Sequence, residues 1–538
     1  MKKVFISLSI ALAVMIGFII GNIITERALT NRFDRSQVSP GGKIDAILNI
    51  INKQYVDSVN ASELIEGVIP KILSGLDPHS VYISASDLQS VNEELEGSFS
   101  GIGVQFNIQY DTVMITGVIS GGPSEKLGIL PGDRIITVND TLFTGKDITN
   151  ERVMKKLRGP KGTVVNIGIQ RAGEKELLQF SIVRGDIPVS SVDIAYMITD
   201  KIGYVKVSKF GSNTYYEFVS ALNNLKKEGA SKFIIDLRGN SGGYLDAAIN
   251  MINEFLEKGA LIVYTEGKAE SRRNFLADGL GRFQENPMVI LIDEWSASAS
   301  EIFAGAIQDN DRGLIIGRRS FGKGLVQQQI PLRDGSAIRL TISRYYTPAG
   351  RSIQKPYKDE DAYENDIMNR YLHGEFDTKD SIHVDKADTI EYRTLREGRI
   401  VYGGGGIMPD IFVPRDTVGM TSYFNKASNS GLLYEYALQY ADQNRARLKA
   451  FPDYKALESY LSAQNLSESF ATFAAGRGIR RNPYLISKSN ALIENKLNAY
   501  IARHIFGDEG FFPILHRKDS AVKRAVEELS LEPRFLQN

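Results

Sequence analysis

An apolar run followed by small residues is the feature that most constrains the fold of this chain. Residues 288–292 are all apolar, which favours a buried strand, and Glu301 to Ile307 favours a helix. Between them lie Ser296, Ser298 and Ser300, so a sharp strand-to-helix turn is predicted. Such a turn exposes a hydroxyl group and leaves backbone N–H groups free to hold an oxyanion.

The same turn has a simpler interpretation as a helix cap. Ser298 and Glu301 have the spacing of a capping box, in which a serine and a glutamate satisfy the first N–H groups of a helix. The segment 321–324 favours chemistry, because Lys323 lies between two glycines and before the strand-like run 325–332. Glycines let the backbone pack closely and bury the amine, and a general base needs a pKa below the usual value of about 10.4.

Gln327 is a candidate for orienting this lysine. It follows Lys323 by an even offset, which on a strand places both side chains on one face. Residues 317–323 also fit the phosphate-loop pattern G-x-x-x-x-G-K, but Gly324 stands where that motif needs Ser or Thr, and a strand-like run follows in place of a helix. The pattern therefore argues against a nucleotide site.

Two further glycine patterns bear on function. Residues 233–237 favour a strand and the chain from Tyr244 favours a helix, with Gly-Asn-Ser-Gly-Gly between them as a second turn. Earlier in the chain, glycine-containing segments recur at 101–106, 122–129 and 131–139. A glycine-rich loop can donate N–H groups to a terminal carboxylate, and an exposed strand edge can accept a peptide as an added strand.

The serine and lysine segments resemble the carboxyl-terminal processing (tail-specific) proteases, and the three glycine segments resemble a PDZ domain in the permuted form of bacterial proteases. The resemblance implies a serine-type endopeptidase that recognises C-terminal tails of proteins and cleaves through an acyl-enzyme, with no metal or organic cofactor. The residues that match the family are the nucleophile Ser298, the base Lys323, the third member Gln327, the oxyanion donors Ala299 and either Gly242 or Gly243, the supporting residues Glu301 and Asp309, the peptide-binding residues Gly101, Ile102, Gly103 and Val104, and the regulatory residue Arg158.

For several of these residues the sequence allows a second, structural role. Glu301 and Asp309 are expected to brace the helix and the lysine in preference to touching substrate. Arg158 matches an arginine that links the PDZ module to the protease site in relatives, and it also fits an exposed helix end. For the whole chain, the rivals are a non-catalytic PDZ scaffold, which requires a charged Lys323 remote from Ser298, and an acyl-thioester enzyme whose two glycine turns hold a thioester oxygen.

The predicted fold is a multi-domain α/β chain whose core, by the resemblance, has crotonase/Clp-protease-like architecture. The predicted insertion or mobile loop at 357–397 interrupts this core, and the C-terminal helices either pack a core or, as in relatives, form a homo-oligomer. The predicted domains are a signal anchor or transmembrane segment at 1–25, an N-terminal helical region at 37–96, a PDZ domain at 97–186, a serine protease core at 187–416 and a C-terminal helical region at 417–538.

Composition and the N-terminal residues limit the partners and the cellular location expected for this chain. The net charge is zero and no basic stripe stands out, so no nucleic acid partner is expected. The chain lacks cysteine, and its five histidines are scattered without an H-E-x-x-H motif, so His79 is expected to be structural. Lys2 and Lys3 precede the apolar run 4–24, which predicts export and an inner-membrane anchor with the catalytic part in the periplasm or outside. The alternative is a cleaved signal and a soluble enzyme; participation of an adaptor protein stays open.

Overall fold

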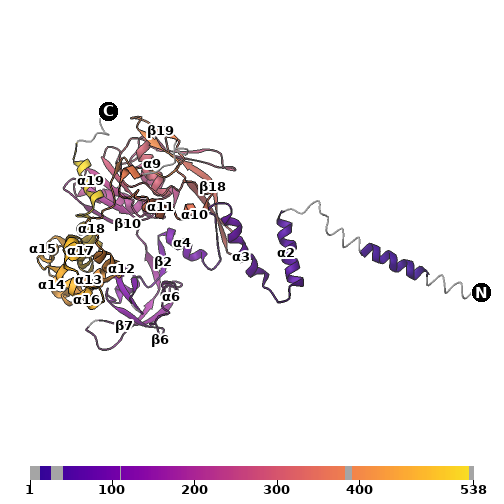
Figure 1. The fold of residues 1–538 in the computed structure, drawn as a ribbon, viewed down its shortest axis with the longest axis horizontal. Coiled ribbons are helices and arrows are strands. Elements are labelled where there is room, and N and C mark those ends of the chain that lie inside the picture. The colour runs from indigo at the N-terminus through magenta and orange to yellow at the C-terminus, as the bar shows by residue number, and fades with distance from the viewer. Residues whose placement is uncertain (1–11, 26–39, 110, 172, 382–389, 532–538) are drawn as a thin grey trace, which may run out of the picture. The chain divides into compact units, whose positions relative to one another are not determined.

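The computed structural model describes residues 12–25, 40–109, 111–171, 173–381 and 390–531 (Figure 1). The chain divides into two compact units, Met1–Leu76 and Asp77–Asn538. In the first unit, helices cover 12–25, α2 (Pro40–Gln54) and α3 (Ala61–Ser74). Asn60 caps α3 by accepting the N–H of Ser62 at 3.0 Å. No helix among the described residues is long and apolar enough to span a bilayer. Residues 1–11 of the predicted anchor lie outside the described part.

The second unit is built around a six-stranded sheet. The run 288–292 forms a strand whose five residues are all buried, as its composition predicts. Parallel strands buried on both faces read as continuous apolar runs, which explains this pattern. The strands, in sheet order, are β10 (Val192–Met197), β11 (Ile202–Val207), β12 (Lys232–Asp236), β15 (Met288–Ile292), β16 (Leu314–Gly317) and β21 (Ile411–Phe412), with β10 antiparallel to β11 and the others parallel.

Helices cover both faces of this sheet. On one face, α7 (Thr214–Lys227), α8 (Leu245–Asn253) and α9 (Ala299–Asp309) pack on alternate strand residues such as Ile235 and Ile290. On the other face, α19 (Ser520–Ser530) packs on the residues that alternate with these, including Ile234 and Leu291. The predicted turns at 239–243 and 296–300 therefore follow β12 and β15, neighbouring parallel strands that end at the same edge of the sheet.

A second sheet forms the wall beside these turns. Its strands are β1 (Val81–Ile83), β18 (Ala337–Tyr346), β13 (Leu261–Glu266) and β14 (Arg273–Leu276), and β17 (Leu325–Pro331) pairs with β18. β17 and β18 are antiparallel and place Gln327 opposite Thr341. A register shift between Val326 and Gln327 marks a bulge in β17.

The region that resembles a PDZ domain is a separate sheet with its own core. Its strands are β3 (Val104–Gln109), β4 (Thr112–Val118), β5 (Arg134–Val138), β7 (Val164–Gln170) and β8 (Leu178–Val183), with β6 (Thr141–Leu142) beside β5 and the helices α5 (Pro123–Lys126) and α6 (Asn150–Leu157). β3 lies at one edge of this sheet. Helix α4 (Leu88–Glu96) and the ribbon of β2 (Ser98–Gly101) with β9 (Gly185–Pro188) connect this region to its neighbours in the chain.

The C-terminal region is helical, as predicted, and its helices have a hydrophobic cluster of their own. Figure 1 shows most of them gathered as one bundle, with α19 apart from it. The members are α12 (Ser422–Asn429), α13 (Leu432–Gln443), α14 (Arg445–Leu448), α15 (Tyr454–Ser462), α16 (Leu466–Gly476), α17 (Pro483–Phe506) and α18 (Asp508–His516).

The interpretation of 357–397 as a mobile loop is wrong for its described part. This segment carries α10 (Glu360–Glu364), α11 (Asp366–Leu372) and β19 (Glu391–Arg393), which pairs with β20 (Ile400–Tyr402). Arg370 and Glu375 are buried and paired at 2.9 Å, and Glu375 also binds Arg319 of the core at 2.7 Å. Two charged residues of this segment therefore form buried ion pairs with each other and with the core. Residues 382–389 lie outside the described part.

Candidate active site

A cavity of about 830 Å³ lies where the two turns meet the second sheet. Ser298, Lys323 and Gln327 all line it, so the structure brings the three predicted catalytic residues to one place. Arg158 and Phe99 line the same cavity from the side of the PDZ region. The scaffold hypothesis requires Lys323 to be remote from Ser298, and this placement argues against it.

Ser298 occupies a strained backbone position at the start of α9. Its φ is +54° and its ψ is −113°, a conformation that residues with a side chain rarely adopt. Its neighbours fix the turn: Ser296 donates to the carbonyl of Leu237 and Ser300 to the carbonyl of Asn240, both at 2.9 Å. Both serines are buried and their hydroxyl groups bind backbone carbonyls. Ser298 is therefore the serine of this turn that lines the cavity.

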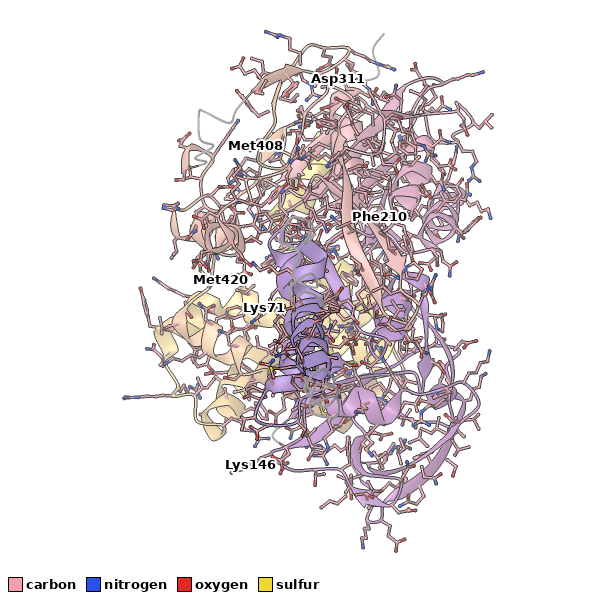
Figure 2. The ribbon with its side chains drawn as sticks, turned by 90° about the vertical axis from the view of Figure 1, so that its right-hand side faces the viewer. Lys71, Lys146, Phe210, Asp311, Met408 and Met420 are labelled. Carbon is pink, nitrogen blue, oxygen red and sulfur yellow. The ribbon has the colours of Figure 1, made fainter. Side chains whose placement is uncertain are left out.

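The structure separates the two glycines that the sequence left equivalent. Gly242 donates its N–H to the side-chain oxygen of Asn240 at 2.9 Å, so this donor is occupied. Phe210, labelled in Figure 2, accepts the N–H of Tyr244 at 2.7 Å and donates to the carbonyl of Gly242 at 2.9 Å. Within the described part of the chain, the N–H groups of Gly243 and Ala299 make no hydrogen bond. Of the predicted oxyanion donors, the N–H groups of Gly243 and Ala299 are therefore the available ones.

Glu301 joins the serine turn to the lysine turn. Its buried carboxylate accepts the N–H of Ser298 at 2.9 Å, which is the glutamate half of the predicted capping box. It also accepts the N–H of Gly322 at 2.7 Å and that of Lys323 at 2.8 Å. Burial raises the pKa of Glu301 to about 7, and hydrogen bonds from Ser320 and these N–H groups oppose the rise. Glu301 therefore holds both turns by hydrogen bonds.

Lys323 is half-buried beside the serine turn. Burial, and next the positive charge of Arg339, lower the pKa of its amine, against the smaller opposing effect of Glu301 and Asp77. The hydroxyl of Tyr345 donates to the carbonyl of Lys323 at 2.5 Å and to that of Ser298 at 3.1 Å, which ties the two turns together a second time. A depressed lysine pKa next to a serine is the electrostatic condition for a neutral amine that acts as a base.

Gln327 reaches the cavity by a different route from the one the sequence indicated. Lys323 precedes β17 and the bulge lies between Val326 and Gln327, so the two side chains do not share a face of one regular strand. Gln327 donates its amide N–H to the hydroxyl of Thr341 at 3.3 Å. Spacing alone could not show the bulge.

Asp309 lies at the far end of α9 from Ser298, where it pairs with the buried guanidinium of Arg351. It also accepts the N–H of Ala349 at 3.0 Å, so its place is structural. Arg158 lies over the ring of Phe99 at 4.3 Å and within 3.7 Å of Glu93. Because both Phe99 and Glu93 line the cavity, Arg158 is placed between the PDZ region and the site.

The predicted peptide-binding residues lie at the start of the edge strand β3. Gly101 ends β2, and Gly103 has a φ of +79°. The carbonyl of Ile102 accepts both the N–H and the hydroxyl of Ser124, at 3.0 and 2.6 Å. Val104 begins β3 and pairs on one side with β4, so the other side of this strand is a sheet edge.

His79, expected from the sequence to be structural, also lines this cavity. It lies in the cavity wall, and burial followed by the charge of Lys323 lowers its pKa to about 4. Its ring nitrogen is 2.7 Å from the hydroxyl of Tyr363, a residue of the segment 357–397. No motif in the sequence links these two residues, because the contact depends on how the chain folds. Among the described residues, no group of three acidic or histidine side chains is placed to hold a metal ion.

Comparisons with known proteins agree with this geometry. Residues 201–363 match the model of peptidase family S41, residues 100–182 match the PDZ domain and residues 25–86 match the N-terminal domain of the activating protease CtpB. Residues 423–507 match a family of unknown function. The chain is therefore assembled from a peptidase module, a PDZ module and flanking regions.

Two curated relatives define its family. The chain is 37% identical over 317 residues to the carboxy-terminal processing protease CtpB of Bacillus subtilis, a match that covers 58% of this chain and 65% of that protein. It is 35% identical over 337 residues to the carboxy-terminal-processing protease of Bartonella bacilliformis, covering 62% of this chain and 76% of that one. This chain belongs to the carboxy-terminal processing proteases, the serine-type peptidases of family S41 that carry a PDZ domain. The match thus spans slightly less than two thirds of the Bacillus protein.

A solved structure titled photosystem II D1 C-terminal processing protease is 25% identical, with a TM-score of 0.35, covering 69% of this chain and 92% of that one.

Proposed function

We propose that this protein is an endopeptidase that recognises the C-terminal tail of a protein through its PDZ region and cleaves the chain with Ser298, Lys323 and Gln327. The observation that carries the proposal is the meeting of Ser298, in its strained turn, and the half-buried Lys323 in one cavity. A serine hydroxyl and a lysine amine with a lowered pKa form the nucleophile–base pair that acyl transfer needs.

The chemistry follows from the groups around Ser298. The neutral amine of Lys323 takes the hydroxyl proton of Ser298 as its oxygen attacks the carbonyl carbon of the scissile peptide bond. The N–H groups of Ala299 and Gly243 donate to the oxyanion that forms. The amine then returns the proton to the leaving nitrogen, the C–N bond breaks and an acyl-enzyme remains. Water, deprotonated by Lys323, attacks the ester, and Ser298 regains its proton as the acid leaves.

The tail-binding role rests on the PDZ region. The exposed edge of β3 can accept an extended peptide as a further strand, and the loop 101–104 stands at its beginning. Arg158 connects the PDZ region to the cavity, because it contacts Phe99 in the cavity wall, and tail binding is proposed to act on the site through this contact. Ligand binding alters the site only if the tail binds the competent state better than the resting one.

The N-terminal residues support an activity outside the cytoplasm. Lys2, Lys3 and the apolar run that follows support export, and the proposal keeps both the inner-membrane anchor and the cleaved signal as outcomes to test. The domain limits predicted from the sequence, the adaptor protein and the homo-oligomer are likewise proposals about the whole protein.

The test compares the full-length protein with Ser298→Ala and Lys323→Ala. The substrates are an unfolded protein with a free apolar C-terminus and the same protein with an amidated one. Both variants are expected to lose cleavage, and the amidated substrate is expected to be cleaved more slowly by the wild type. Ser271→Ala and Lys268→Ala, at exposed positions, serve as matched controls and should cleave normally.

Equal cleavage by Ser298→Ala and the wild type would reject the assigned nucleophile. Binding of the free tail without cleavage by the wild type would instead support the scaffold alternative.

A further inference from the structure

The segment Asp77–Ser80 contacts the second sheet at Thr341, which lies opposite Gln327. Asp77 accepts the hydroxyl of Thr341 at 3.0 Å, the N–H of His79 at 2.8 Å and the N–H of Ser80 at 2.9 Å. The hydroxyl of Ser80 donates to the second oxygen of Asp77 at 2.6 Å and accepts the N–H of Thr341 at 3.1 Å. Asp77 is 8% exposed, so its carboxylate is held by protein groups and its oxygens have fixed roles.

These contacts give each hydrogen bond a direction. Because the Asp77 carboxylate can only accept, Thr341 must donate its hydroxyl proton to it. The Thr341 oxygen is then an acceptor, and Gln327 donates its amide N–H to it at 3.3 Å. With its nitrogen used in this way, Gln327 has its amide oxygen left to accept a hydrogen bond in the cavity that Lys323 lines. Without the acceptor at Thr341, the amide of Gln327 is free to turn over and present its NH₂ group instead.

We propose that Asp77 and Thr341 form a positioning chain that fixes the orientation of the Gln327 amide, so that its oxygen faces the Lys323 amine. This inference rests on the proposed role of Lys323 as the general base. Neither Asp77 nor Thr341 touches the reacting atoms, and both act through Gln327. An amide oxygen accepts hydrogen bonds from the amine in both its protonation states, whereas an NH₂ group would compete for the lone pair that must take the serine proton.

The charged and titratable groups around Lys323 come from three elements. Arg339 lies on β18, Glu301 on α9, and Asp77 and His79 on the segment before β1, while Tyr345 of β18 binds the lysine carbonyl. Thr341 is uncharged, so replacing it leaves all of these charges in place. A change in the pH dependence of Thr341 variants therefore reports the hydrogen-bond chain and not a lost charge.

The experiment measures kcat and KM against pH for Thr341→Val and Thr341→Ser, with Lys323→Ala in parallel. Valine keeps the branched shape that β18 favours and removes the hydroxyl, whereas serine keeps the hydroxyl. Thr341→Val is expected to lower kcat about fivefold to tenfold with KM little changed. The acid limb of the kcat–pH profile of Thr341→Val should move to lower pH. The amide oxygen of Gln327 stabilises the ammonium form of Lys323, so loss of this contact lowers the pKa of the lysine. Thr341→Ser should keep both kcat and the position of the acid limb close to those of the wild type.

The outcomes separate the two hypotheses. If Lys323→Ala is inactive and the pH profile of Thr341→Val is unchanged, the positioning chain is rejected and the proposed function stands. Full activity of Lys323→Ala would overturn the proposed function, and with it the chain that acts through this lysine. A Thr341→Ser variant that behaves like Thr341→Val also rejects the chain. Should Thr341→Val fail to fold, Thr341→Ala removes the hydroxyl without filling the space and gives the same comparison.

Discussion

At the scale of single residues, Glu301 shows how a structural and a catalytic interpretation can describe one motif. Its spacing from Ser298 predicts a capping box, and the carboxylate does accept the Ser298 N–H. The same carboxylate accepts the N–H groups of Gly322 and Lys323, which lie on another loop. The cap was predictable because it is local in sequence. The link to Lys323 was expected only from the resemblance to the family, because it depends on two loops meeting in the folded chain.

Arg339 offers a residue-scale test of the electrostatics of the base. Its positive charge is the largest cause, after burial, of the lowered pKa of Lys323. Arg339→Gln removes this charge, so the lysine pKa should rise and a larger fraction of the amine should be protonated at neutral pH. We expect the acid limb of kcat/KM to move to higher pH, opposite to the shift expected for Thr341→Val. The measurement is kcat/KM against pH at low ionic strength, where screening is weakest.

Two variants control for other effects of this change. Arg339→Lys keeps the positive charge and should keep the limb near its original position. Arg344→Gln removes a charge from an exposed position on the same strand and should leave the limb unmoved. A limb that stays in place in Arg339→Gln would show that this charge does not act on the base.

At the scale of elements, the sequence predicted both strand-to-helix turns and the strand after Lys323. It could not choose between Gly242 and Gly243, because the choice depends on the Asn240 side chain occupying one N–H group. Its reason for placing Gln327 with Lys323 was wrong, because a period of two assumes a regular strand and the bulge breaks that regularity, although both residues line the cavity. Such errors arise where hydrogen bonds between elements, and not patterns within one element, decide the geometry.

The glycine turn provides an element-scale prediction. Gly243 has a φ of +142°, and a Cβ atom there would overlap the carbonyl oxygen of Phe210. Gly243→Ala must therefore shift the turn and move the N–H donor away from the oxyanion. We expect kcat to fall about 100-fold, the usual cost of losing one such donor. Rates would be measured under saturating substrate, beside the free energy of unfolding from urea titration.

Gly239→Ala is the matched control for this turn. Gly239 also has a positive φ, +72°, but a Cβ atom there meets nothing within 4 Å. Alanine should cost about 1 kcal/mol of stability from the strained backbone and leave kcat close to that of the wild type. Equal loss of kcat in both variants would mean that general strain, and not the position of the Gly243 donor, explains the effect.

At the scale of the whole molecule, the end of the chain completes the protease core. The sequence predicts that the C-terminal region is helical, and its apolar stripes suggest packing. It does not reveal that α19 returns to cover the second face of the central sheet, because that contact joins residues far apart in the chain. Asp519, which caps α19, pairs at 2.8 Å with Arg238 at the start of the glycine turn. Docking of α19 therefore supports both the sheet and one of the two turns of the site.

This arrangement predicts that a charge on the buried side of α19 destabilises the core. Val522 is 1% exposed and packs with the strand residues of the covered face. Val522→Asp buries a carboxylate without a partner, which should lower the free energy of unfolding by about 3 to 5 kcal/mol. Lys523→Asp places the same residue at the exposed neighbouring position, where a change within about 0.5 kcal/mol is expected. Urea titration followed by circular dichroism compares the two. If Val522→Asp unfolded at the same urea concentration as Lys523→Asp, α19 would not be docked on the sheet, and its support of the glycine turn would have to be abandoned.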